Sequence, residues 1–131
     1  MSNEFVFGNA VEEGRQESCY PGWFIGSFVS PALGLRCNGD VEVKWGIHEP
    51  NDEKRSGGTN DKSMTLTLLI SGSLLMQFPQ LNTEVTLQRP GDYVLFAPKV
   101  QHRWRSLSDS VVVTVRWPSL PPSAATGQDP S

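Results

Sequence analysis

Cysteine and histidine are both scarce in this sequence, which argues against a zinc knuckle or a metal cluster. The 131 residues include two cysteines and two histidines. Cys19 and Cys37 do not form a Cys-x-x-Cys pair, so the usual two-cysteine half of a zinc site is missing. We expect free thiols in a reducing cytosol. The sequence leaves open whether the two cysteines lie close enough to pair.

Long hydrophobic runs are also missing. The longest, TLTLLISGSLLM, is too short and too rich in Thr and Ser to span a bilayer. The N-terminal stretch MSNEFVFGNAVEEGRQES has neither the basic segment nor the apolar segment of a secretory signal. We therefore expect a cytoplasmic protein with no membrane partner.

Positive charge is not in excess, and two common catalytic motifs are missing. The net charge is −3, whereas nucleic-acid phosphates favour a basic surface, so we expect no nucleic-acid partner. The serines lack the Gly-x-Ser-x-Gly pattern of a nucleophile elbow. Gly57 and Gly58 lie in a polar stretch with no helix expected after it, so they do not form a phosphate-binding loop.

Short runs of Val, Ile, Leu, Thr, Phe and Trp, separated by turn residues, fill the middle of the chain. No segment shows a sustained 3.6-residue apolar period with caps at both ends. Many short strands at close spacing predict an all-β sandwich or barrel. The expected strands are 22–29, 32–37, 41–48, 64–71, 73–78, 84–88, 92–97, 100–107 and 110–117.

The length fits a single domain with flanking segments. We expect an N-terminal arm over residues 1–19, a barrel over 20–118 and a disordered tail over 119–131. The tail is rich in Pro, Ser and Ala and offers too little apolar surface to offset the entropy of ordering it. In the arm, the apolar start around Phe5 suits an edge strand. The polar stretch 49–63 is expected to be a long loop.

Two stretches together resemble the cupins, which are small double-stranded β-helix (jelly-roll) barrels. They are TLTLLISGSLLMQF and VTLQRPGDYVLFAPKVQHRW. In cupins a strand ends in a glycine that turns into the next strand, and Gly72 matches it. Gly91 and His102 match the first glycine and the histidine of a later motif, whereas Ala97 and Lys99 replace its first proline and second glycine. The resemblance covers more than half of the chain and implies an all-β cupin barrel.

The same resemblance implies that the usual cupin metal site is missing. That site takes two histidines and a glutamate from the first motif. Counting back from Gly72, the glutamate position is Thr65, and the histidine positions fall within residues 58–61, which contain no histidine. Asp61 is the only common metal ligand among them. We therefore expect no metal and no other cofactor.

A nonstandard metal site remains an alternative. Catalytic zinc needs three protein ligands and an open position, and non-haem iron needs two histidines and a carboxylate. His48 and His102, with Asp61 or Glu49, could supply such a set, although not at the cupin spacing. The chain would then be a metal-dependent oxygenase, isomerase or lyase. Whether it catalyses any reaction stays open.

Strand alternation indicates which side chains share a face. His102 and Trp104 share one, and the resemblance places Thr65 and Thr67 in the barrel mouth with His102. His48 shares the face of Glu42 and Lys44, which predicts a peripheral position. The candidate ligand-binding residues are His102, Trp104, Thr65, Thr67, Tyr93 and His48.

These observations predict a small single-domain cupin that binds a small organic ligand or metabolite. Aromatic and aliphatic walls with a few polar groups are typical of such a site. His102 would supply a donor and an acceptor, and Trp104 or Tyr93 a stacking surface. The structural alternative is a dimeric interaction module with a filled barrel, in which Trp45 and Trp117 are core residues. The resemblance implies a homodimer formed through sheet faces and N-terminal arms.

Overall fold

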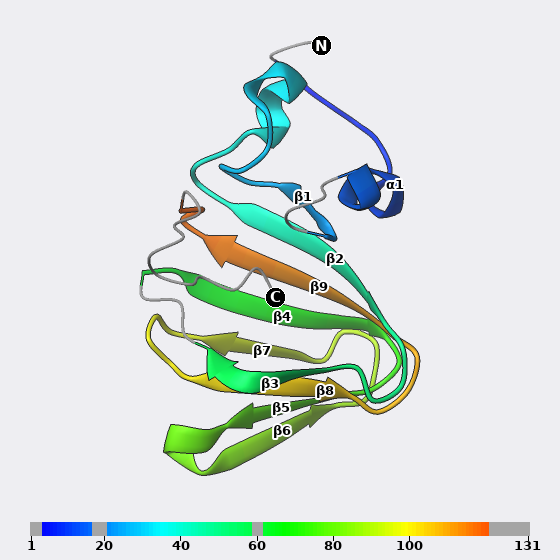
Figure 1. The fold of residues 1–131 in the computed structure, drawn as a ribbon, viewed down its shortest axis with the longest axis vertical. Helices are drawn as coiled ribbons and strands as arrows, with labels where there is room; N and C mark the ends of the chain where they lie inside the picture. The colour runs from blue at the N-terminus through cyan, green and yellow to red at the C-terminus, as the bar shows by residue number, and fades with distance from the viewer. Residues whose placement is uncertain (1–3, 17–20, 59–61, 121–131) are drawn as a thin grey trace.

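The structure is a computed structural model that describes residues 4–16, 21–58 and 62–120. Two antiparallel β-sheets face each other (Figure 1). The predicted all-β, double-stranded β-helix fold is confirmed. Among the described residues, no helix has the length and apolar composition that a membrane crossing requires.

The larger sheet has five strands in the order β1-β2-β9-β4-β7. Its central strand, β9, pairs along its length with β2 on one side and β4 on the other. This register aligns Lys44, Thr114 and Thr67 in one row across three strands. The bounds are β1 (Trp23–Ile25), β2 (Glu42–His48), β4 (Met64–Ser71), β7 (Tyr93–Phe96) and β9 (Ser110–Trp117).

The smaller sheet has four strands in the order β3-β8-β5-β6. Its bounds are β3 (Glu53–Gly58), β5 (Leu74–Phe78), β6 (Thr83–Leu87) and β8 (His102–Ser106). The expectation of a continuous loop over 49–63 is wrong, because β3 lies within it and pairs with β8. The strand was missed because it has no apolar alternation. Charged residues are common on an edge strand, where they oppose pairing with another chain.

A helical turn occupies a place where a strand was expected. The expected strand over 32–37 is wrong: Pro31–Arg36 is a 3₁₀ segment, η1, with proline in its first turn. The Ser30 hydroxyl caps it by accepting from the Ala32 N–H at 3.3 Å, and Gly34 breaks it at a φ of +70°. Serine before proline is a helix-start signal that outweighs the apolar alternation here. A second 3₁₀ turn, η2 (Pro79–Leu81), follows β5.

The N-terminal arm contains a helix rather than the expected edge strand. The helix α1 (Ala10–Gln16) is capped by Asn9, whose side-chain oxygen accepts from the backbone N–H groups of Val11 and Glu12. It lies beside β1 and β2 (Figure 1). Phe5 lies outside any strand, and its side chain is 63% exposed.

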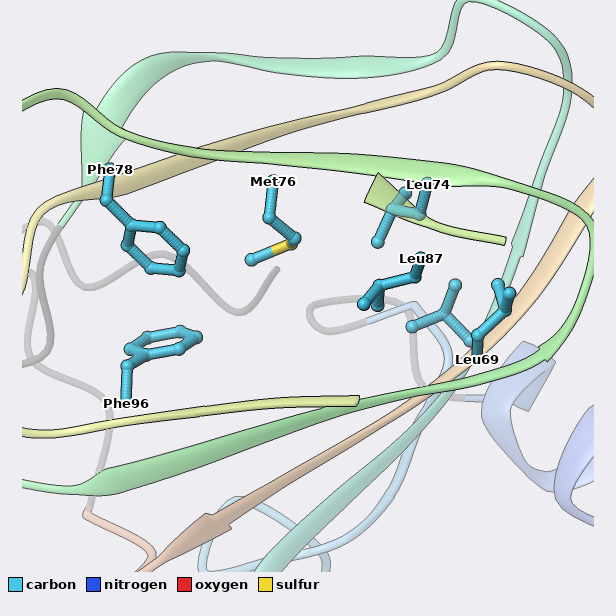
Figure 2. Packing of buried hydrophobic residues seen from close by; sticks show 7 residues of the cluster. Leu69, Leu74, Met76, Phe78, Leu87 and Phe96 are labelled. Carbon is cyan, nitrogen blue, oxygen red and sulfur yellow. The ribbon is translucent and has the colours of Figure 1, made fainter. Parts of the chain in front are cut away.

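The apolar core lies between the sheets (Figure 2). Leu74, Met76 and Phe78 of β5 point across to Leu69 of β4 and Phe96 of β7. The rings of Phe78 and Phe96 meet edge to face, with centroids 5.5 Å apart. Burial of these side chains holds the two sheets together, and each fully buried one contributes about 1.5–3 kcal/mol.

The larger sheet is apolar on its outer face, which reverses two expectations. Trp117 is 38% exposed and Trp45 is half-buried on that face, so neither is a core residue. The buried tryptophan is Trp23, at 1% exposure. The face of β2 that carries Glu42 and His48 points into the barrel instead of lying at its periphery.

The barrel extends past Pro118, the predicted end of the domain. Ser119 is buried, its N–H donates to the Gly39 carbonyl at 3.0 Å, and its hydroxyl accepts from the Ser27 N–H at 2.9 Å. Residues 121–131 of the predicted tail lie outside the described residues. Cys37 is a free cysteine, and Cys19 also lies outside the described residues.

Candidate functional site

A cavity of about 30 Å³ lies between the sheets, and most of the side chains predicted to bind a ligand line it. Tyr93 is not among them. Because Val94 and Phe96 of β7 face inward, Tyr93 faces outward, and its side chain is 62% exposed. The described residues that line the cavity are Lys44, His48, Thr65, Thr67, Leu74, Met76, Phe96, His102, Trp104, Val112, Thr114 and Arg116.

His102, at the start of β8, is a buried polar group in the wall of the cavity. Its side chain is 4% exposed and its ring lies 4.6 Å from that of Phe96, centroid to centroid. Nδ1 is 3.2 Å from the carbonyl oxygen of Val100. Because a carbonyl only accepts, Nδ1 donates, and Nε2 of the neutral ring is then an acceptor. The imidazole therefore has a fixed orientation.

His48, at the end of β2, lies against the indole ring of Trp104 with centroids 4.4 Å apart. Its Nδ1 donates to Oδ2 of Asp52 at 2.8 Å. Asp52 comes into reach because the chain turns after β2, where Asn51 adopts a φ of +67°. Analysis of the sequence missed this carboxylate. The sequence pattern that could have predicted it is a histidine followed, across a Pro-Asn turn, by an aspartate.

Burial lowers the pKa of His48 below its usual 6.5, although the hydrogen bond to Asp52 opposes the shift. A pKa lowered by folding stabilises the protein above the unfolded value, and this contribution is lost as the pH falls through the folded pKa. We predict that the free energy of unfolding falls between about pH 7 and about pH 5. Urea unfolding across this range measures it. His48→Gln, which keeps a donor for Asp52, should flatten the curve, and an unchanged slope would contradict the assignment.

Two cations, Lys44 and Arg116, enter the cavity from the larger sheet, and analysis of the sequence missed both. Lys44 Nζ and Arg116 Cζ lie 5.9 Å and 4.8 Å from the ring centroid of Trp23. Arg116 Nη1 is 3.9 Å from Oε1 of Glu42, beyond hydrogen-bonding distance. Burial raises the pKa of the Glu42 carboxyl above its usual 4.5, against the opposing effect of Arg116.

The described residues do not fit the usual cupin metal centre. Thr65, at the position of the glutamate ligand, offers a hydroxyl in place of a carboxylate. Among the described residues, no three His, Cys, Asp or Glu side chains lie close enough together to hold a metal ion. Glu49 is exposed, and Asp61, the other proposed carboxylate, lies outside the described residues.

Comparison with known proteins gives structural relatives alone. No family model and no curated protein matches the sequence. KdgF from a Halomonas species superposes with a TM-score of 0.57 at 14% identity, over 63% of this chain and 74% of that chain. A Klebsiella pneumoniae protein with a double-stranded β-helix domain gives 0.57 at 17% identity, over 65% and 69%. An RmlC-like cupin from Desulfovibrio desulfuricans gives 0.55 at 11% identity, over 63% and 76%.

These identities are too low to transfer an activity, but the superpositions agree with the sequence motifs. Gly72 turns from β4 into β5 at a φ of +91°, as the first cupin motif requires. Gly91 turns into β7, and His102 opens β8 inside the barrel. From the two facing sheets, these turns and the structural relatives, we conclude that the chain has the cupin fold.

Proposed function

We propose that the protein binds a small organic ligand in the cavity between its two sheets. The observation that supports this is a group of polar side chains on the inner face of the larger sheet, beside the core residues Leu69 and Phe96. Lys44, Thr67 and Arg116 point inward, although buried polar groups cost free energy unless they are satisfied. Apolar side chains such as Ile47 face outward. Packing a core does not require this arrangement, whereas recognition of a polar ligand does.

The opposite wall of the cavity, formed by the smaller sheet, is apolar around His102. Leu74, Met76 and Trp104 provide a leucine, a methionine and an aromatic surface. A few polar groups among apolar walls are the usual composition of a small-molecule site. In this proposal the imidazole of His102 and the hydroxyls of Thr65 and Thr67 orient the ligand, while Trp104 stacks on it.

Replacement of His102 tests the proposal, and two variants separate binding from stability. His102→Ala leaves the Val100 carbonyl without its partner, so we predict a loss of about 1–3 kcal/mol in unfolding free energy. His102→Asn keeps a donor near the position of Nδ1 but removes Nε2. It should therefore remain more stable than the alanine variant. A thermal-shift screen identifies a compound that binds the parent protein. Both variants should bind this compound more weakly than the parent protein does.

Urea unfolding and calorimetric titration measure the two effects. If His102→Asn bound the compound as tightly as the parent protein, the ligand contact of His102 would be refuted. His102 would then be a core histidine.

A second candidate function is supported by the small size of the cavity. A volume of about 30 Å³ is sufficient for about two water molecules. This suits the alternative of an interaction module with a filled barrel. The apolar outer face of the larger sheet supports it too, since Ile47, Tyr93 and Leu95 are 58%, 62% and 48% exposed. In either function we propose that this face forms a homodimer.

The dimer proposal makes its own prediction. Leu95→Lys places a charge within the proposed buried interface, so light scattering after gel filtration should show a dimer for the parent protein and a monomer for this variant. Leu81→Lys is the matched control. Leu81 is 62% exposed but lies in η2, next to the smaller sheet, so the dimer should persist. A monomeric parent protein, or dissociation by both substitutions, would contradict the proposed interface.

A further inference from the structure

The charged groups at the cavity have one predominant sign. Of the described residues that line it, two have basic side chains, Lys44 and Arg116, and none is Asp or Glu. Behind this lining, Asp52 accepts a hydrogen bond from His48 at 2.8 Å, and Glu42 lies 3.9 Å from Arg116. The pKa of Glu42 is raised by burial, so its charge is itself disfavoured at this position. The lining therefore favours negative charge.

Hydroxyl donors lie beside both cations. In the pairing of β2, β9 and β4, Lys44 is opposite Thr114, which is opposite Thr67. In the next inward-facing row, Arg116 is opposite Thr65. Side chains directly opposite in antiparallel strands lie about 4.5–5.5 Å apart at Cβ. Each cation can therefore act together with a threonine hydroxyl on the same bound group.

The arrangement of charge, hydroxyls and apolar surface suits a specific chemical class. Carboxylate oxygens accept charge-assisted hydrogen bonds from Lys and Arg, which are roughly twice as strong as neutral ones. Leu74 and Met76 of the smaller sheet face the cation-bearing wall, where they suit a short hydrocarbon part. The volume of about 30 Å³ limits the part of the ligand that enters the cavity to little more than its carboxylate group, so the hydrocarbon part must be short. We propose that the ligand is a small aliphatic monocarboxylate, held through its carboxylate by Lys44, Arg116 and the threonine row.

This inference rests on the proposed ligand-binding function and adds the sign of the ligand's charge. A matched pair of probes tests it: propionate, and propionamide, which has the same shape without the charge. We expect calorimetric titration of the full chain, at constant ionic strength set with sodium chloride, to detect binding of propionate alone. Lys44→Met should weaken that binding by about tenfold or more, because a charge-assisted hydrogen bond is lost.

Two further variants keep the test informative. Lys99→Met is the matched control, since Lys99 is exposed and does not line the cavity; it should leave propionate binding unchanged. If Lys44→Met does not fold, Thr67→Val removes one hydroxyl with almost no change in shape. That variant should bind propionate more weakly by about fivefold or more, since a hydrogen bond to a charged group is lost.

Three outcomes would overturn the inference. Equal or tighter binding of propionamide would refute the preference for an anion while leaving small-molecule binding intact. Binding of propionate that survives both Lys44→Met and Thr67→Val would place the carboxylate elsewhere. If propionate does not bind, the carboxylate class is wrong, and a further failure of all neutral compounds in the thermal-shift screen would also refute the proposed function.

Discussion

Gly72→Ala should lower the free energy of unfolding by about 3 kcal/mol, through two effects that add. Gly72 has a φ of +91°, which costs a residue with a Cβ about 1–2 kcal/mol. A Cβ there would also lie 2.3 Å from the Asp109 carbonyl oxygen and 2.4 Å from the Ser110 hydroxyl. That hydroxyl accepts from the N–H of Ser73, so relief of the clash would disturb the turn into β5.

Gly91→Ala is the control for the conformational effect alone. Gly91 has a similar φ of +96°, and an added Cβ would meet nothing within 4 Å. Its cost should therefore be about 1–2 kcal/mol. Urea unfolding of both variants gives the difference. Equal losses would show that steric contact around Gly72 contributes nothing and that the β4–β5 turn can shift at no cost.

These glycines explain why the fold could be predicted from the sequence. A positive φ at a strand end favours glycine, so Gly72 and Gly91 mark the turns that connect the sheets. The strands β4 and β9 are runs of β-branched and apolar residues bounded by turn residues, and they could be located to the residue. The strand β3 could not be located, because its pairing with β8 depends on backbone hydrogen bonds that polar residues make equally well.

The candidate site could be predicted only in part. His102 and Thr65 follow from the cupin motif, and Trp104 follows from alternation along β8. The inward position of Lys44 could not be inferred, because alternation separates two faces without showing which one is buried. The usual assumption is that the apolar face of a strand is buried, and for β2 this assumption places the wrong face inside the barrel. A protein whose outer sheet face is apolar violates that assumption.

The second large effect on the free energy of unfolding is expected from the buried charged side chains of Arg116 and Glu42. Arg116→Met should lower the free energy of unfolding by about 3–5 kcal/mol near pH 8, because it leaves a carboxylate buried without its cation. The side chains of Arg116 and Glu42 are only 3% and 5% exposed, so solvent screens their interaction weakly. Arg116→Met combined with Glu42→Gln removes both charges. This double variant should recover most of the lost stability, since replacing a buried pair by neutral groups is often close to neutral.

The loss in Arg116→Met should also depend on pH in a defined direction. Arg116 opposes the rise in the pKa of Glu42, so its removal raises that pKa further. A carboxyl whose pKa is raised by folding loses stability as the pH rises from the unfolded value of 4.5 through the folded value. The variant should therefore be closest to the parent protein at about pH 5 and furthest from it near pH 8. Urea unfolding at both values measures this. A loss that is independent of pH and unrelieved by Glu42→Gln would show that Arg116 stabilises the barrel through its stacking on Trp23, and not through Glu42.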